Sequence, residues 1–341
     1  MPAHTLTELL NIDHPVLQAP MAGGITTSGF VADVSNFGML GSMASGYLSL
    51  EQVDSFIGHV QAQTTAPFSV NIFVDYDDYG QDRFAKPQEI IQIETGLGLE
   101  EDHSFTIPPP PSMRDLITLL IDRKVPVVST TFGLLKDDDV AALKQAGIVL
   151  MTTVNAVDEI DIALQTQDSD ILIFQNAHAG GHKGGFSNGG HSDVTVFSAA
   201  MRRHPDKPFI MAGGIVTRDQ IEQALKMGFA GVQIGTGFLA TKQSAASQAY
   251  KQSILDATDQ EDTMFTTSIT GKSARGLKNT LAQLALIHNM GFPHLHYATA
   301  SLRKYAKAID NPDYQSLWAG TGVTSINGIP DLHDYMQSLV K

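Results

Sequence analysis

The chain has 341 residues, of which 43% are hydrophobic and 17% charged, so it can bury the core of one large globular domain. Its net charge of −14 argues against a nucleic-acid partner, because such a partner requires a basic face. The absence of cysteine excludes disulfides, thiolate metal sites and cysteine nucleophiles.

The start of the chain does not resemble a targeting segment. Residues 1–15 lack the basic and long apolar regions of a secretory signal. No apolar run approaches the roughly 20 residues of a membrane span. We therefore expect a cytoplasmic protein with no membrane partner.

Short apolar runs alternate with amphipathic segments over the first two thirds of the chain. Strands are predicted at 16–19, 38–42, 67–74, 126–130, 147–153, 171–174, 208–212 and 231–235. Helices are predicted at 28–37, 50–63, 113–123, 137–145, 157–165 and 194–203, and one more opens at Thr217 with Gln220 in a capping box, burying Ile221, Ala224 and Leu225. Eight strands that alternate with helices predict a (β/α)₈ TIM barrel. The alternative, an open doubly wound sheet, lacks a GxGxxG fingerprint after the first strand.

A long segment, 75–112, interrupts the alternation after the third strand. It is acidic and aromatic at its start and ends in four prolines. Insertions of this length are lids, binding loops or decoration. We favour a lid or a partner contact.

The last third of the chain has a helical pattern, with helices expected at 247–257, 279–289, 296–309 and 331–340. The sequence thus predicts a barrel core (1–241), a helical subdomain inserted before the last barrel helix (242–310) and a closing segment (311–341). The stretch 270–279 contains GKS but not the glycine spacing of a P-loop. Its Arg275 and Lys278 lie either over a phosphate or anionic substrate, or at a solvated helix start.

The stretch 170–185, DILIFQNAHAGGHKGG, is the most informative in the chain. A buried strand ends at Gln175 and opens into a loop with His178, His182 and four glycines. Parallel α/β folds perform their chemistry at such strand ends, and glycine lets the backbone approach a ligand closely. On the motif alone, a flexible surface loop with solvated histidines is an equal alternative.

Metal binding by the two histidines is not expected. Ligation at a spacing of four residues requires a helix, and the intervening glycines oppose one. His191, further along, is interpreted as a solvated loop residue. Trp318 is interpreted as a packing residue or a wall of the pocket.

Two glycine pairs follow the last two predicted strands. Gly213 and Gly214 come after the seventh strand, and Gln233 to Thr236 end the eighth. These loops are neighbours in a barrel, where backbone N–H groups and a hydroxyl form a phosphate site. The sequence therefore predicts a phosphate site here.

Further polar residues at other strand ends suggest what the phosphate belongs to. Met21–Ala22–Gly23 forms a tight loop after the first strand, and Asn71 and Gln175 can match the donors and acceptors of a pyrimidine-like ring edge. Flavin mononucleotide (FMN) fits such a pocket. Asn71 has a second interpretation, as a buried residue that satisfies backbone groups.

Seven motifs in order along the chain resemble one known family. PVLQAPMAGG, FSVN, QNAHAGGHKGG, AGGI, VQIGTGFLAT, TGKSARGLKN and SLWAGTG are similar to those of the nitronate monooxygenases, formerly 2-nitropropane dioxygenases. The resemblance implies an FMN-containing TIM barrel with His182 as the catalytic residue. Together with the glycine pairs, it implies FMN binding by Ala22, Gly23, Asn71, Gln175, Gly180, Gly181, Gly213, Gly214, Gln233, Ile234, Gly235 and Thr236.

The chain departs from the family pattern at two positions. His178 stands where the family usually has glutamate, and Thr321 stands where it commonly has glutamine after WAG. We expect both near the substrate, so that they bear on substrate identity more than on fold or cofactor.

The implied activity is FMN-dependent oxidation of alkyl nitronates by O₂ to a carbonyl compound and nitrite. His182 would hydrogen-bond the nitronate oxygens, and would act as general base on a neutral nitroalkane, since an unperturbed imidazole titrates near working pH. The implied partners are a small nitronate or nitroalkane and O₂, with a homodimer as a candidate assembly. The alternatives are an FMN-dependent NAD(P)H enoyl-acyl-carrier-protein reductase, an NAD(P)H:quinone reductase, and a flavin-binding protein without turnover.

Overall fold

The computed structural model describes residues 5–74, 82–99, 102–187 and 189–341. Eight parallel strands pair in the order β1-β11-β10-β8-β7-β6-β3-β2, and a parallel bridge between Leu17 and Leu40 brings the first and last together. These strands are β1 (Val16–Gln18), β2 (Gly41–Ala44), β3 (Phe68–Phe73), β6 (Val127–Thr131), β7 (Val149–Val154), β8 (Ile171–Gln175), β10 (Phe209–Ala212) and β11 (Gly231–Ile234). The predicted (β/α)₈ barrel is confirmed.

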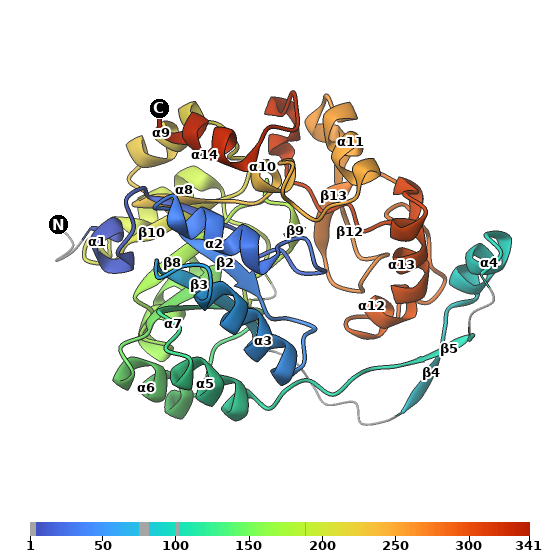
Figure 1. The fold of residues 1–341 in the computed structure, drawn as a ribbon, viewed down its shortest axis with the longest axis horizontal. Coiled ribbons are helices and arrows are strands. Elements are labelled where there is room, and N and C mark those ends of the chain that lie inside the picture. The colour runs from blue at the N-terminus through green and yellow to red at the C-terminus, as the bar shows by residue number, and fades with distance from the viewer. Residues whose placement is uncertain (1–4, 75–81, 100–101, 188) are drawn as a thin grey trace.

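Helices follow the strands and cover the barrel (Figure 1). They are α2 (Ser28–Asn36), α3 (Leu50–Gln61), α5 (Met113–Asp122), α6 (Asp137–Gln145), α7 (Asp158–Thr166), α8 (Val194–Met201), α9 (Arg218–Lys226) and the closing α14 (Leu332–Val340). The predicted capping box of Thr217 and Gln220 opens α9. Leu225, predicted to be buried, is instead 37% exposed in the last turn of that helix.

The barrel interior contains both apolar and polar side chains, among them the hydrogen-bonded Ser42 and Ser69. Leu17, Leu40, Met151, Ile173 and Ile210 form one buried cluster there, together with two leucines of the N-terminal helix α1 (Leu6–Leu10). The predicted second strand begins later than expected, at Gly41. Gly38 forms the turn before it, with φ +86° and the Asp13 side chain packed against its Cα.

The C-terminal third is mixed rather than helical. It contains α10 (Thr236–Leu239), α11 (Gln248–Asp256), η1 (Gln260–Asp262), α12 (His294–Ala298), α13 (Ala300–Ala308), η2 (Pro312–Tyr314) and η3 (Thr321–Ser325). It also contains an antiparallel hairpin of β12 (Thr263–Thr266) and β13 (Ala274–Leu277), which pairs with β9 (Gly181–His182). The helix-start interpretation of Arg275 is therefore wrong, because Arg275 lies in β13.

The helix predicted at 279–289 does not form, and turns replace it. The Asn279 amide donates to the carbonyls of Pro312 (2.7 Å) and Gln315 (2.9 Å), and its oxygen accepts from the backbone of Ala282 (2.8 Å). The bonds to Pro312 and Gln315 hold this stretch against a distant segment, so tertiary contacts outweigh the helical pattern.

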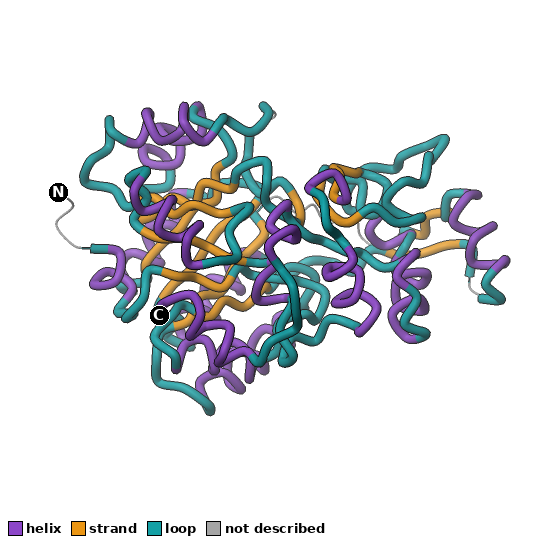
Figure 2. The backbone as a smooth tube through the Cα atoms, turned by 90° about the horizontal axis from the view of Figure 1, so that it is seen from above, coloured by secondary structure: helices purple, strands orange, loops and turns teal. Residues whose placement is uncertain are grey.

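The inserted segment reaches from the barrel to the C-terminal helices. Its described part holds β4 (Arg83–Ala85), α4 (Gln88–Gly96) and β5 (Ser104–Thr106), beside α12 and α13 at the far end of the molecule (Figures 1 and 2). The buried Lys86 ammonium contacts Glu94 (2.8 Å) and donates to Ser301 of α13 (2.8 Å). The segment is thus docked on the C-terminal region. Residues 75–81 and 100–101 of the expected lid lie outside the described residues.

None of the described helices is long and apolar enough to cross a bilayer.

Candidate active site

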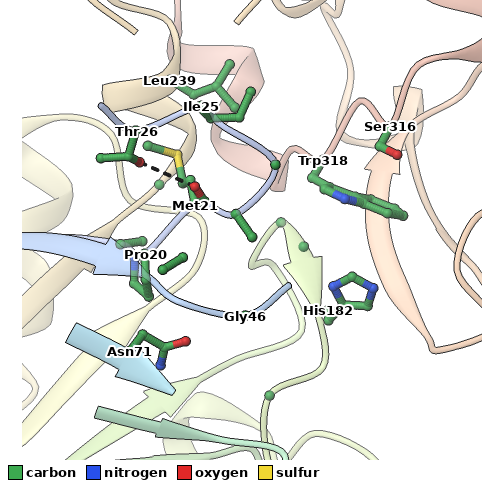
Figure 3. A pocket seen from close by; sticks show the side chains of 18 of the residues that line it. Pro20, Met21, Ile25, Thr26, Gly46, Asn71, His182, Leu239, Ser316 and Trp318 are labelled. Atoms are coloured by element: carbon green, nitrogen blue, oxygen red, sulfur yellow. Dashed lines mark hydrogen bonds between the residues drawn. The ribbon is translucent and has the colours of Figure 1, made fainter. Parts of the chain in front are cut away.

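A cavity of about 720 Å³ opens at the carboxyl ends of the barrel strands, between the barrel and the C-terminal region (Figure 3). It is lined by the loops after β1, β8, β10 and β11 and by α13. The predicted site residues that line it are Ala22, Gly23, Asn71, Gln175, Gly180, Gly181, His182, Gly213, Gly214, Gln233, Gly235 and Thr236. Ile234 is absent from this lining because its side chain is buried in the core beside Val16 and Phe30. Among the described residues, none from the inserted segment lines the cavity.

The loop after β8 is held at both ends of its turn. The Gln175 side chain accepts a hydrogen bond from the Gly184 backbone (2.8 Å) and donates one to the His182 carbonyl (2.9 Å). The Asn155 amide donates to the same Gln175 oxygen (2.9 Å). On the other side, His182 pairs with Ala274 in the strand ladder. Gln175 therefore positions the loop that carries His182.

His182 projects from β9 into the cavity, beside the Trp318 indole (Figure 3). Its ring centroid lies 5.3 Å from that of Trp318 and 5.9 Å from that of Phe132. Its Nε2 is 2.8 Å from the Thr270 hydroxyl, which fixes the ring orientation. Trp318 is thus a wall of the cavity as well as a packing residue.

The imidazole of His182 is neutral at physiological pH. Burial, and then the positive charges of Lys272 and Arg303, lower its pKa to about 3 from an ordinary 6.5. This shift could not be expected from the sequence, which suggested an imidazole that titrates near working pH. A neutral imidazole with so low a pKa is a poor proton acceptor and a good hydrogen-bonding group.

Asn71 is buried on β3, and its amide nitrogen donates to the hydroxyls of Ser129 (2.9 Å) and Thr131 (2.8 Å). The interpretation of Asn71 as an internally satisfied residue therefore applies to its nitrogen. Its oxygen has no hydrogen bond among the described residues, which leaves an acceptor for a ligand in the cavity that Asn71 lines.

The two glycine loops at the ends of β10 and β11 line one side of the cavity. Gly213 and Gly214 have φ angles of +112° and +75°, which residues other than glycine rarely adopt. A Cβ at Gly213 would also clash with the side chain of Asn176, whose amide donates to the Gly213 carbonyl (3.1 Å). Thr236 contributes a hydroxyl that accepts from the Gly320 backbone (3.0 Å). These features give a backbone-lined wall with one hydroxyl, at the position where the sequence predicts a phosphate.

The two departures from the family pattern contact each other. His178 Nδ1 lies 3.1 Å from the Thr321 hydroxyl, and the Thr321 backbone donates to the His178 carbonyl (3.0 Å). Both lie behind Gly214, at whose position a Cβ would be 3.2 Å from His178 Cβ. Among the described residues, neither belongs to the cavity lining, so the pair braces the glycine loop. His178 and His182 have different hydrogen-bond partners.

Sequence reasoning missed the wall opposite the barrel. Tyr47 stacks on His296 with ring centroids 4.0 Å apart and planes 6° apart, and Arg303 donates to the His296 carbonyl (2.6 Å). The cavity lining found among the described residues includes Arg303, Lys304 and Lys307 as its charged groups and contains no aspartate or glutamate. The R-K-x-x-K pattern of α13 was the sequence feature from which this charged wall could have been predicted.

Two other interpretations change. His191 is a loop residue, as expected, but it is only partly exposed: its ring stacks on Phe265 at 5.6 Å, and burial, followed by Lys183 and Arg275, lowers its pKa to about 4. Arg275 donates to the Ala177 carbonyl (2.9 Å) and lies over the Phe265 ring. Arg275 thus anchors the loop that carries His178 and His182.

An eight-stranded parallel barrel, with its cavity at the carboxyl ends of the strands and a histidine on a glycine-rich loop there, defines a (β/α)₈-barrel enzyme. The family model for nitronate monooxygenase matches residues 3–341. The chain belongs to the nitronate monooxygenase family, whose members are flavin-dependent oxidoreductases.

Individual relatives agree with this assignment. A probable nitronate monooxygenase of Bacillus subtilis is 34% identical, over 93% of this chain and 92% of the relative. One of Staphylococcus saprophyticus is 34% identical, over 92% and 90%. Among solved structures, nitroalkane oxidase from Streptomyces ansochromogenes superposes with a TM-score of 0.85 at 27% identity, covering 98% of this chain and 96% of that one. FabK from Thermotoga maritima, at 24% identity and a TM-score of 0.74 over 99% and 95%, shares the fold.

Proposed function

We propose that this enzyme binds FMN and oxidises alkyl nitronates, such as propionate 3-nitronate, with O₂ to a carbonyl compound and nitrite. The observation that carries the proposal is the charge of the cavity. The lining found in the described part of the chain has positive groups and no carboxylate, and the pKa of His182 is lowered to about 3. Such a site attracts an anion but holds no strong base. A nitronate is already an anion at the reacting carbon, so no proton has to be removed.

The residues present fit FMN. The positive-φ glycines 213 and 214, with Gly235 and Thr236, offer one cradle for one phosphate. Within the described structure, neither the Asn71 side-chain oxygen nor the Gln233 side chain makes a hydrogen bond. Bound FMN would accept two electrons from the substrate and pass them to O₂.

The protein's own groups would bind and orient the nitronate. His182, neutral and fixed by Thr270, hydrogen-bonds the nitronate oxygens. Lys272, whose ammonium lies 4.3 Å from the centroid of the Phe132 ring, and Arg303 add positive charge close enough to lower the pKa of His182. Trp318 and Phe132 enclose the imidazole and limit its access to water.

We also propose a separate role for each of three segments of the chain. Residues 1–241 hold the cofactor, residues 242–310 supply the charged wall of the substrate site, and residues 311–341 close the barrel. The presence of Thr270, His296 and Arg303 in the cavity lining supports the second assignment.

Oxidation of neutral nitroalkanes is the second candidate, favoured by the similarity to nitroalkane oxidase. It requires removal of a proton from carbon. The lowered pKa of His182 makes this the slower reaction.

The test is aerobic turnover by the FMN-loaded protein. We expect nitrite release and O₂ consumption with propionate 3-nitronate, and a lower kcat/KM with the matching nitroalkane. Turnover of an enoyl thioester or a quinone with NAD(P)H, without nitronate oxidation, would support the reductase alternatives instead.

A further inference from the structure

The segment that follows His182 is held by side chains from elsewhere in the chain. The backbone N–H groups of residues 184–187 each donate to a side-chain oxygen. In chain order the acceptors are Gln175 Oε1, Asn155 Oδ1 and, for the last two groups, Glu159 Oε1. Because each of these donors has an acceptor in the protein, this part of the loop has a fixed position.

Glu159 joins two loops at the carboxyl ends of neighbouring strands. It lies in the first turn of α7 and is fully buried. One carboxylate oxygen accepts from the N–H groups of Phe186 (2.6 Å) and Ser187 (2.5 Å) in the loop after β8. The other accepts from those of Asn155 and Ala156 (3.0 Å for Ala156), directly after β7. A carboxylate offers acceptors alone and can bind all four N–H groups, whereas an amide offers one oxygen and two donors.

The last glycine of the HKGG sequence, Gly185, is required by this contact. A Cβ at Gly185 would lie 2.5 Å from Asn155 Oδ1 and 2.6 Å from both Glu159 oxygens. The φ angle of Gly185 lies outside the left-handed region, so close approach is the reason that only glycine fits. At this position the group that approaches the backbone is a protein side chain rather than a ligand.

The network reaches His182 through Gln175. The Asn155 amide donates to the Gln175 carbonyl (2.6 Å) and side-chain oxygen (2.9 Å), and the Gln175 amide donates to the His182 carbonyl (2.9 Å). The Gly184 carbonyl also accepts from the backbone of Phe132 (2.8 Å), whose ring borders the imidazole. The same hydrogen bonds therefore hold the imidazole and one wall of its pocket.

We propose that Glu159 is a positioning residue that, through Asn155 and the backbone of residues 184–187, sets the place of His182 in the cavity. The inference rests on the proposed function, in which His182 binds the nitronate oxygens. Glu159 is not among the described residues that line the cavity, so it acts on the reaction through the imidazole. A displacement of a reacting group by about 1 Å can lower a rate about 100-fold, so loss of the contact should be measurable.

A double-mutant cycle tests whether Glu159 acts through His182. Glu159→Gln keeps the shape of the side chain but turns an NH₂ group toward two of the four N–H groups. The limiting rate of flavin reduction by propionate 3-nitronate, measured anaerobically per bound flavin, should fall about 10- to 100-fold. In the His182→Asn background the same substitution should lower this rate less than about threefold, because the imidazole through which it acts is gone.

The fluorescence of Trp318 gives a second readout that needs neither cofactor nor substrate. Trp318 is the single tryptophan of the chain, and its ring centroid lies 5.3 Å from that of His182. Glu159→Gln should shift the emission of the apoprotein toward that of His182→Asn, and should change it no further in the His182→Asn background. The control Glu94→Gln alters another buried carboxylate, in the inserted segment, and should change neither the emission nor the rate per bound flavin.

Gly185→Ala tests the same contact from the loop side and serves if Glu159→Gln does not fold. Its Cβ would lie too close to Asn155 and Glu159, so the loop must move away from them. We expect the same fall in the rate per bound flavin and the same direction of change in Trp318 emission.

Three outcomes overturn the positioning role. The first is an unchanged rate per bound flavin in Glu159→Gln or Gly185→Ala. The second is a double variant in which the losses from Glu159→Gln and His182→Asn multiply, which would make Glu159 a structural residue that acts independently of His182. The third is a lowered rate with unchanged Trp318 emission. The expected change in emission, in a protein whose parent oxidises no nitronate, would leave the positioning role standing and refute the proposed function.

Discussion

Gly214→Asp separates cofactor binding from folding at the proposed phosphate cradle. Gly214 has φ +75°, and a Cβ there would lie 3.2 Å from His178 Cβ, so any side chain strains the loop. A left-handed backbone costs a non-glycine residue about 1–2 kcal/mol. The carboxylate adds repulsion of about 4 kcal/mol for each unit charge 4 Å away at an effective dielectric constant of 20. FMN binding should therefore weaken about 100- to 1,000-fold, while stability falls by only about 1–2 kcal/mol.

Gly214→Ala is the matched control, because it introduces the same backbone strain without the charge. We would titrate each apoprotein with FMN by quenching of flavin fluorescence, and measure unfolding of the apoproteins in urea. The alanine variant should lose similar stability but retain much tighter FMN binding than the aspartate variant. Equal FMN affinities in the two variants, or a fully yellow Gly214→Asp protein, would show that the phosphate binds elsewhere.

Other consequences concern histidines and the docked insertion. His182→Asn should keep FMN bound but lower kcat/KM for the nitronate about 10²–10³-fold, which is the usual effect of removing a donor to an oxyanion. His178→Asn should lower kcat/KM less. A larger loss in His178→Asn would move the catalytic assignment from His182 to His178. The pKa values of His182 (about 3) and His191 (about 4) are lowered from 6.5, so their contribution to stability is fully present above pH 6.5 and is lost as pH falls through 4 toward 3. The free energy of unfolding in urea should therefore depend less on pH in the double Asn variant, and an unchanged slope would contradict the shifts. Lys86→Met leaves the Glu94 carboxylate buried without its charge partner and should lower the free energy of unfolding by about 3–5 kcal/mol. The double variant Lys86→Met/Glu94→Leu should regain most of that stability. A Lys86→Met protein as stable as the parent would mean that the inserted segment is not docked as described.

The barrel and the turns of the two glycine pairs could be predicted because their signals are local. Apolar runs of strand length alternate with amphipathic segments, and glycine pairs mark the turns where φ is positive, as at Gly213 and Gly214. The hairpin of β12 and β13 was missed because its short strands are stabilised by pairing with Gly181 and His182, far away in the chain. The spacing of apolar residues along one segment carries no information about such a distant pairing partner.

The charged wall and the pKa of His182 also depend on long-range contacts. Tyr47 follows the second barrel strand and Arg303 lies on α13, so only the folded chain brings them to one cavity. The pKa of His182 is lowered by burial and by the charges of Lys272 and Arg303, two residues that are far from His182 in the sequence. The contact between His178 and Thr321 belongs to the same class: each stood out as a departure, but their pairing behind Gly214 required the structure.

Anaerobic reduction of the FMN-loaded protein tests the central claim most directly. The oxidised flavin absorbance should bleach rapidly on mixing with propionate 3-nitronate, and only slowly or not at all with NADH or NADPH. This result would follow from a site that binds a preformed carbanion equivalent through His182 and positive charge. Rapid bleaching by NADH or NADPH with none by the nitronate would contradict the account and identify the protein as a pyridine-nucleotide-dependent reductase.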